Sequence, residues 1–256
     1  MKITVLADNN SIIDHYYLAE PALSLFIEED RHKILFDTGY SDVFRINGEK
    51  MGIDFKTIDT VVISHGHNDH TGGLAYLQDL KQKIKLFAHP DASGDKEYEG
   101  VDISMPVKFE RLNDNFELCL SAKPVNITKK LIFLGEIERS WQKVDPLEDD
   151  ELHDDTAVVY KKADGIFIIT GCSHSGIINI CEYSKKVTGI NHIKGIIGGF
   201  HMLDNEKLNK EVAEYFAGEN IEMIYPCHCT DLKAKIALSR VVQIKEVGVS
   251  LEIAVS

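Results

Sequence analysis

The most constraining feature of this sequence is a group of imidazole and carboxylate side chains directly after an apolar run. The β-branched residues TVVI lead into SHGHNDHTGG, which places His65, His67, Asp69 and His70 within six positions. Imidazole and carboxylate are ligands that suit zinc, iron and manganese. Two histidines one residue apart can close on one ion, and Asp69 and His70 can turn towards a second ion beside it. The segment therefore predicts a metal site at the end of a buried strand.

Other short runs along the chain have the pattern of β-strands. They are rich in β-branched residues or alternate apolar with polar residues. These runs are 2–8, 23–29, 32–39, 58–67, 131–135, 156–171, 193–199 and 221–228. Apolar residues at helical spacing predict helices over 71–83, 204–219 and 232–243, and the first of these begins with a glycine pair beside the histidine cluster. The chain thus mixes short strands with a few helices.

Length and composition favour one folded domain. A chain of 256 residues can bury a substantial core without disulfide bonds. It has no internal repeat, low-complexity tract or Pro/Gly-rich linker, so we predict a single domain over 1–256. The stretch of about 90–155 carries acidic and aromatic residues with few periodic patterns, and we interpret it as an insertion or lid over the site.

The formal net charge of −13 at pH 7 argues against a nucleic acid or an anionic membrane surface as partner, because both attract clustered Lys and Arg. A small molecule, including a phosphorylated one, is the expected partner. No apolar run approaches the ~18 residues that a membrane span needs. The N-terminal MKITVLADNN lacks the features of a secretory signal. We therefore expect a cytoplasmic location, and the sequence leaves the oligomeric state open.

The chain contains five cysteines at irregular spacing, which favours reduced thiols over a disulfide framework. Cys119 and Cys181 have no motif around them, so a role as small buried residues is expected. The CHC triplet at 227–229 has two interpretations, a metal or redox feature and a buried packing residue.

The pattern HxHxDH at residues 65–70 resembles the signature of the metallo-β-lactamase superfamily. This resemblance implies an α+β fold, the αββα four-layer sandwich, with one or two metal ions at the edge of the sheets. LFDTG matches the early strand-end motif of the family, which implies that Asp37 orients a metal ligand without binding metal itself. The later runs GIFIITGCSH, IIGGFH and YPCHCTD match the later strand-end motifs.

Two metal ions need more ligands than the histidine cluster supplies, and the later strand ends offer them. We predict His174 and His228 as ligands because each follows a strand. The family has a bridging aspartate where Cys172 stands, so a thiolate is an alternative ligand there, and His153 before DDTAVVY is another. His201 follows a glycine pair and is predicted as a general acid or a ligand. Zinc is the first choice of metal, with iron and manganese as alternatives. The other histidines have no motif context and are predicted as structural or surface residues: His15, His32, His89 and His192.

The motifs GEIER, DDTAVVY, TGCSHSGI, GGFH and PCHCT resemble a narrower subgroup, the 7,8-dihydropterin-6-methyl-4-(β-D-ribofuranosyl)aminobenzene-5′-phosphate synthases and their relatives. Members often have a histidine after an early glutamate, whereas here Glu20 is followed by Pro21. Glu20 is a predicted substrate-binding residue. Arg139, with Lys143 near Trp141, is a predicted phosphate-binding residue, because a guanidinium group matches the phosphate oxygens.

The sequence leaves three functions open. The leading hypothesis is a metal-dependent hydrolase in which a metal-activated water attacks an ester or phosphoester, with Asp69 as a ligand that also orients the nucleophile. The second is a pterin-related synthase that releases pyrophosphate. The third is a metal-containing metabolite-binding or sensor protein without turnover. A di-iron oxygen reductase fits less well, because such enzymes typically carry an acidic residue where His67 stands.

Overall fold

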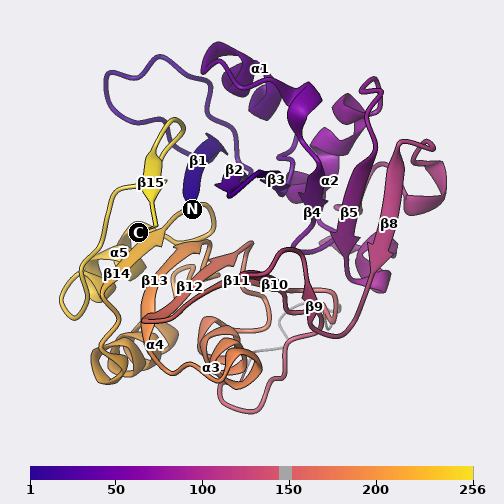
Figure 1. Ribbon diagram of the computed structural model, residues 1–256. Helices are drawn as coiled ribbons and strands as arrows, with labels where there is room; N and C mark the ends of the chain where they lie inside the picture. The colour runs from indigo at the N-terminus through magenta and orange to yellow at the C-terminus, as the bar shows by residue number, and fades with distance from the viewer. Residues whose placement is uncertain (144–151, 256) are drawn as a thin grey trace. The chain divides into compact units, whose positions relative to one another are not determined.

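The structure is a computed structural model that describes residues 1–143 and 152–255. The chain divides into two compact units. Unit 1 contains residues 1–121, 152–154 and 247–255, and unit 2 contains residues 122–143 and 155–246. Each unit has one large β-sheet and an apolar core of its own (Figure 1). The single domain expected from the sequence stays a prediction.

The sheet of unit 1 has seven strands in the order β15-β1-β2-β3-β4-β5-β8. Their bounds are Lys2–Ala7 for β1, Ser24–Glu29 for β2, His32–Phe36 for β3, Thr60–Val62 for β4, Ile84–Ala88 for β5, Phe116–Leu120 for β8 and Glu252–Ala254 for β15. Neighbours from β15 to β3 pair antiparallel, whereas β3, β4, β5 and β8 pair parallel. The segments that follow β3, β4 and β5 therefore leave the sheet at one edge.

Short helices pack on the sheet of unit 1. The α-helices are α1 (Val43–Lys50) and α2 (Asn68–Thr71), and the 3-10 helices are Phe55–Thr57, Gly72–Leu77, Pro90–Ser93 and Phe109–Arg111. A separate two-stranded hairpin joins β6 (Glu97–Tyr98) to β7 (Val101–Asp102). The buried side chains of Phe44, Leu74 and Leu77 pack against those of the sheet in one cluster. Burial of this apolar surface is the main force that holds the helices on the strands.

The helix predicted over 71–83 is wrong in type and length. The chain forms the 3-10 helix Gly72–Leu77 and then returns to the sheet as β5. A β-carbon on Gly73 would lie 2.0 Å from the carbonyl oxygen of Thr38, and the Gly73 N–H donates to the Gly39 carbonyl at 3.2 Å. The glycine pair thus allows close packing against the segment after β3. The Gly73 N–H bonds to this segment and not to a carbonyl one turn earlier, as it would in the predicted α-helix.

The sheet of unit 2 has six strands in the order β14-β13-β12-β11-β10-β9. Their bounds are Val125–Asn126 for β9, Leu131–Phe133 for β10, Ala157–Lys162 for β11, Gly165–Thr170 for β12, Ile193–Gly198 for β13 and Met223–Pro226 for β14. The run predicted over 156–171 is two strands, β11 and β12, joined as a hairpin. β12, β13 and β14 are parallel, so their carboxyl ends also meet at one edge.

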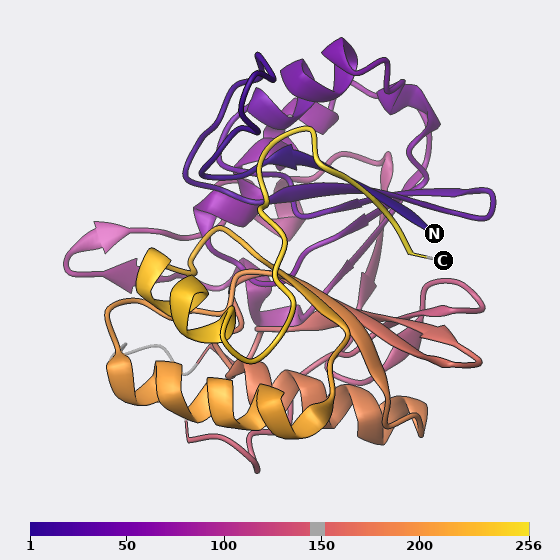
Figure 2. The ribbon, with the colours of Figure 1, turned by 90° about the vertical axis from the view of Figure 1, so that its left-hand side faces the viewer.

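Three helices belong to unit 2: α3 (Ile177–Thr188), α4 (Glu206–Glu219) and α5 (Leu232–Leu238). Their apolar side chains form one core with β11, β12 and β13, and Figure 2 shows the two long orange helices along one face of this sheet. The structure confirms the helix predicted over 204–219, shortens the one over 232–243, and adds α3. Among the described residues, every helix is too short or too polar to cross a membrane.

The stretch of about 90–155, interpreted as an insertion or lid, contributes strands to both sheets. β8 pairs with β5 in unit 1, and β10 pairs with β11 in unit 2. These strands have two to five residues, which is too short for a clear period in the sequence. Residues 144–151 of this stretch lie outside the described residues, and a lid stays a prediction.

Candidate functional site

The edge where β3 and β4 end carries the predicted metal ligands of unit 1. Asp37 directly follows β3, and His65 lies three residues after β4. The carboxyl ends of parallel strands are the usual position of ligand sites in sheets with helices. The Asp37 N–H donates to the Val62 carbonyl at 2.8 Å, and the Thr38 N–H donates to the His70 carbonyl at 2.8 Å. These backbone hydrogen bonds fix the two segments against each other.

Asp37 is completely buried. Its carboxylate contacts Ser64, directly before the histidine cluster, and His70 within it. Its carboxylate accepts hydrogen bonds from the Ser64 N–H and the Ser64 hydroxyl, both at 2.7 Å, and its Oδ2 lies 2.7 Å from His70 Nδ1. A carboxylate on one ring nitrogen fixes the tautomer and directs the other nitrogen, Nε2, to a metal. Asp37 therefore has the geometry of a residue that orients a ligand.

The imidazole ring of His65 lies against the rings of His67 and His70. Ring centroids are 4.6 Å apart for His65 and His67, and 4.2 Å apart for His65 and His70. Ser64 Oγ lies 2.9 Å from His65 Nδ1, and His65 Nε2 lies 3.1 Å from His67 Nδ1. Two Zn–N bonds of about 2.0–2.1 Å at a tetrahedral angle separate their nitrogens by about 3.3 Å. The spacing of these two nitrogens therefore fits a shared zinc ion.

The remaining members of the cluster also suit a cation. Asp69 Oδ2 lies 3.7 Å from His70 Nε2, and the Asp69 side chain is partly exposed. Burial lowers the pKa of His67 below its ordinary value, although the charge of Asp69 acts in the opposite direction. A lowered pKa favours the neutral imidazole, which is the form that binds metal.

Replacing Asp37 by asparagine should weaken zinc binding by about 10–100-fold, because the carboxylate that orients His70 is lost. Competition with a chromogenic chelator measures the affinity. Asp59→Asn is a matched control, since Asp59 lies 3.5 Å from His32 in a partly exposed pair. An Asp37→Asn protein that is folded and binds zinc as tightly as the control would contradict this role.

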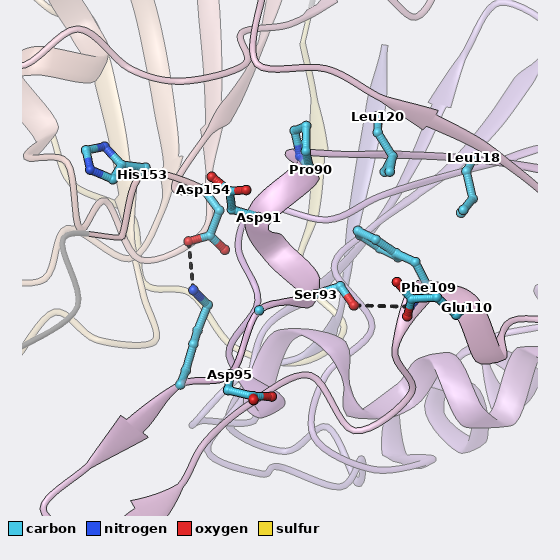
Figure 3. Close-up of a pocket in the computed structure, with 12 residues that line it drawn as sticks. Pro90, Asp91, Ser93, Asp95, Phe109, Glu110, Leu118, Leu120, His153 and Asp154 are labelled. Carbon is cyan, nitrogen blue, oxygen red and sulfur yellow. Dashed lines mark hydrogen bonds and ion pairs between the residues drawn. The ribbon is translucent and has the colours of Figure 1, made fainter.

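Gly66, between two of the histidines, is held by a buried ion pair. Its N–H donates to Asp154 Oδ2 at 2.7 Å, and Asp154 Oδ1 lies 3.0 Å from Lys96 Nζ. The Lys96 and Asp154 side chains are 4% and 1% exposed. This pair borders a pocket of about 630 Å³ with a mixed apolar and acidic lining, shown in Figure 3. The pocket residues include Phe109, Leu118, Leu120, Glu110, Asp91 and His153.

In unit 2, the segments after β12, β13 and β14 carry the later predicted residues. Backbone hydrogen bonds tie these segments together: the Gly199 N–H donates to the Gly171 carbonyl at 2.8 Å, and the Met202 N–H donates to the Cys229 carbonyl at 3.2 Å. The segment after β12 supplies Cys172 and His174, and the segment after β13 supplies His201. Figure 1 shows the three strands side by side.

The side chains of these segments form a second cluster of potential ligands. Each of Cys172, His228 and Cys229 offers one ligand atom, and these atoms lie within 4.8 Å of one another. The rings of His174 and His201 are 4.3 Å apart between centroids. Imidazole and thiolate are both zinc ligands, so unit 2 also carries a donor set that fits a divalent metal.

Several residues of this edge have a backbone conformation that is uncommon outside glycine. The φ angles are 61° for Ser173, 48° for His201 and 50° for His228, and Asp37 in unit 1 has 53°. Histidine and aspartate enter this region more often than most residues, but it still costs conformational energy. Such positions concentrate at functional sites, where the surrounding structure holds them in place.

The cysteines differ in their surroundings. The five cysteines, all within the described residues, are free thiols. Burial raises the pKa of Cys119 and Cys181, and Cys181 belongs to the apolar core of unit 2. Burial acts in the same direction on Cys229, but hydrogen bonds with Cys172 and His201 and the charges of nearby histidines hold its pKa well below the usual value.

Three predicted site residues lie outside both clusters. Glu20 accepts hydrogen bonds from the Tyr40 N–H at 3.1 Å and the Ser41 hydroxyl at 2.6 Å, so its carboxylate fixes the segment after β3. Arg139 is exposed in unit 2. His153 borders the pocket of Figure 3. Substrate binding by Glu20 and Arg139 and metal binding by His153 stay predictions.

Sequence reasoning missed Lys96 and Asp154, and it considered Cys229 only as part of the CHC triplet, with a metal or redox role left open. The CHC triplet at 227–229 was the available signal for Cys229. Lys96 had no signal, because its partner lies 58 residues away in the sequence. The four histidines without a motif each make a polar contact outside the two clusters. His15 lies beside Ser250, His32 beside Asp59 and His192 beside Glu222. His89 is buried, and its Nδ1 accepts a hydrogen bond from the Asp91 N–H.

A model of the metallo-beta-lactamase superfamily matches residues 18–228. This match spans most of the chain and includes Asp37, the histidine cluster and His228. The chain belongs to the metallo-beta-lactamase superfamily. Members of this superfamily generally bind divalent metal ions, typically zinc, and most are enzymes. The family inferred from HxHxDH is therefore confirmed.

Two relatives from Methanocaldococcus jannaschii resemble this superfamily member over nearly its whole length. The chain is 35% identical over 260 residues to the uncharacterized protein MJ0448, which covers 93% of this chain and 94% of that protein. It is 29% identical over 266 residues to the 7,8-dihydropterin-6-methyl-4-(beta-D-ribofuranosyl)-aminobenzene-5'-phosphate synthase, with coverages of 92% and 89%. The second relative confirms the resemblance to the synthase subgroup.

A solved structure supports the fold. The crystal structure of Tm1679, described as a metal-dependent hydrolase of the beta-lactamase superfamily, matches with a TM-score of 0.86 and 29% sequence identity. The match covers 100% of this chain and 99% of that one. The predicted fold class, that of the metallo-β-lactamase superfamily, is confirmed.

Proposed function

We propose that this protein is a metal-dependent hydrolase that cleaves an ester or phosphoester bond in a small molecule. The observation that carries the proposal is the unit 1 cluster, in which three imidazoles and Asp69 gather at one sheet edge and a buried carboxylate, Asp37, orients one of them. Zinc is the proposed metal, and the two clusters together offer enough donors for two ions.

The residues of the clusters have distinct proposed roles. A bound divalent metal supplies Lewis-acid polarisation and makes water acidic enough to act as a nucleophile near neutral pH. Asp37 and Ser64 fix the tautomers of His70 and His65 through the hydrogen bonds at 2.7 Å and 2.9 Å. Asp69, whose carboxylate is partly exposed, orients the attacking water and accepts its proton. His201 is the proposed proton donor to the leaving oxygen.

Charge and composition support a small substrate. A net charge of −13 argues against broad electrostatic attraction to nucleic acid or anionic lipid. A phosphorylated metabolite in the cytoplasm is the proposed substrate class, and Glu20 and Arg139 are the proposed substrate-binding residues.

The test is a phosphoester and ester panel with protein of known metal content. We expect protein purified without added metal to contain zinc, to lose hydrolysis after treatment with a chelator, and to recover it when zinc is restored. Asp69→Asn should lower kcat strongly, because the carboxylate that accepts the proton is lost. Asp164→Asn removes an exposed carboxylate paired with Lys194 and should leave the rate unchanged.

Two outcomes would contradict the proposed hydrolase. One is hydrolysis that persists in the fully chelated protein. The other is tight binding of a metabolite with no turnover of any ester or phosphoester in the panel, which would favour the metabolite-binding or sensor function.

The 29% identity to the dihydropterin-related synthase favours a second candidate, a synthase that joins a pterin pyrophosphate to a ribosylaminobenzene phosphate. In this reaction the metal would hold the pyrophosphate leaving group. Release of pyrophosphate only when both substrates are present would favour the synthase, whereas hydrolysis of a single phosphoester would favour the hydrolase.

A further inference from the structure

One edge of the unit 1 sheet carries backbone groups that face away from the sheet. β8 is the last strand on its side, and among the described residues no strand pairs with its outer edge (Figure 1). On the inner edge, the Asn115 carbonyl and the Ser121 N–H bond to backbone groups of β5 at 2.8 Å and 3.0 Å. Alternate residues of a strand bond to the same neighbour. The N–H and C=O groups of Leu118 and Leu120 therefore point outward.

The side chains of the same two leucines line a pocket. Leu118 and Leu120 are 42% and 39% exposed, and they lie on one face of β8 because successive side chains of a strand alternate. Together with the buried Phe109 they line the pocket of about 630 Å³ in Figure 3. The outer edge of β8 thus places backbone donors and acceptors beside an apolar floor, which is the arrangement that accepts an added strand.

The uncompensated charge of this pocket is negative. Two of its carboxylates, Asp95 and Asp154, pair with lysines at 2.9 Å and 3.0 Å. The other two, Asp91 and Glu110, are exposed and form no ion pair with a lysine or arginine among the described residues. A ligand with a basic side chain would therefore complement the rim of the pocket, whereas an acidic ligand would be repelled.

We propose that the outer edge of β8 and this pocket bind an extended peptide segment of another protein, with basic and apolar side chains on one face. An added strand gains affinity from main-chain hydrogen bonds and specificity from pockets for every second side chain. One apolar side chain of the segment packs on Leu118, Leu120 and Phe109, and a lysine or arginine two residues away reaches Asp91 or Glu110. This interaction goes beyond the proposed hydrolase and depends on neither metal nor turnover.

The experiment measures binding of defined peptides to the full chain. The probes are fluorescein-labelled hexapeptides of the form X-Thr-X-Thr-X-Thr, with lysine, leucine or glutamate at each X. Threonine favours the extended conformation, and the X side chains lie on one face. In fluorescence anisotropy, peptides that combine lysine and leucine should bind, and more weakly at high salt. Peptides with glutamate at every X should not bind.

Two variants test the backbone edge and the rim separately. Leu118→Pro removes an outward N–H, and proline is tolerated on an edge strand when that N–H faces away from the sheet. It should weaken binding at least about 10-fold, since a hydrogen bond and the leucine contact are both lost. Glu110→Gln should weaken binding by about 2–5-fold, as for an exposed ion pair. Glu211→Gln, an exposed position of α4 in unit 2, is the matched control and should have no effect.

A peptide N-methylated at every residue keeps its side chains but loses its backbone donors, so we expect it not to bind. This comparison uses the wild-type protein and decides the inference even if Leu118→Pro fails to fold. Equal binding of the N-methylated peptide would show that only the pocket is used, as by a small amine, and would overturn the added strand. The proposal would also fail if no peptide of the set bound, or if folded Leu118→Pro protein bound them as tightly as the wild type.

Discussion

Replacing Lys96 by methionine should lower the free energy of unfolding by about 3–5 kcal/mol. The ammonium group of Lys96 lies 3.0 Å from Asp154 Oδ1, and both side chains are almost completely buried. Methionine keeps most of the apolar stem but leaves the Asp154 carboxylate buried without its cation, and breaking a buried pair in this way costs about 3–5 kcal/mol. For a chain of this length the melting temperature should fall by about 6–20 °C.

Lys108→Met is the matched control, because Lys108 pairs with Asp95 at 2.9 Å on the surface, where the Asp95 side chain is 98% exposed. Exposed pairs contribute about 0–1 kcal/mol. Urea denaturation and thermal melts of both variants measure the difference. If Lys96→Met were no less stable than Lys108→Met, the buried pair would have no structural importance. The double variant Lys96→Met with Asp154→Asn should recover part of the loss, since it removes the stranded charge.

Gly66→Ala should disrupt the histidine cluster of unit 1. A β-carbon at this position would lie 1.9 Å from the carbonyl oxygen of Ala92 and 2.8 Å from Lys96 Cε. The backbone between His65 and His67 must then move away from Ala92, and the hydrogen bond to Asp154 is lost. We expect a destabilisation of about 1–3 kcal/mol, as for other overpacked sites. Zinc affinity should fall by at least about 10-fold, which is typical when ligands lose their support.

Gly218→Ala provides the control, because a β-carbon there meets no atom within 4 Å. Gly218 lies in α4, where alanine is favoured over glycine by about 0.8–1.0 kcal/mol. Chelator competition measures the zinc affinity, and denaturation measures the free energy of unfolding. Together they distinguish a change confined to the histidine cluster from a loss of stability of the whole protein. If the Gly66→Ala protein bound zinc as tightly as the wild type, the close packing of the Gly66 backbone against Ala92 would not be needed to position His65 and His67.

The strands could be predicted from the sequence because their signal is local. β-branched runs gave the positions of β1, β2, β3 and β13, and the order of polar residues after them indicated the ligand-bearing segments. Helices were predicted less well. α3 was missed although Ile177, Ile180, Cys181 and Ser184 are buried at helical spacing and Gly189 ends the helix in the left-handed conformation, which is a usual C-terminal signal.

The sequence by itself determined the superfamily and the HxHxDH motif, and it predicted the position of Asp37 beside that motif, since these depend on short spacings within single segments. Only the tertiary structure decided that Lys96 pairs with Asp154 across 58 residues and that Cys229 approaches Cys172 across 57. These contacts depend on the order of strands in each sheet and on where a glycine permits close approach. Hydrophobic periodicity shows which face of a strand is buried, but it does not specify which distant strand end lies beside it.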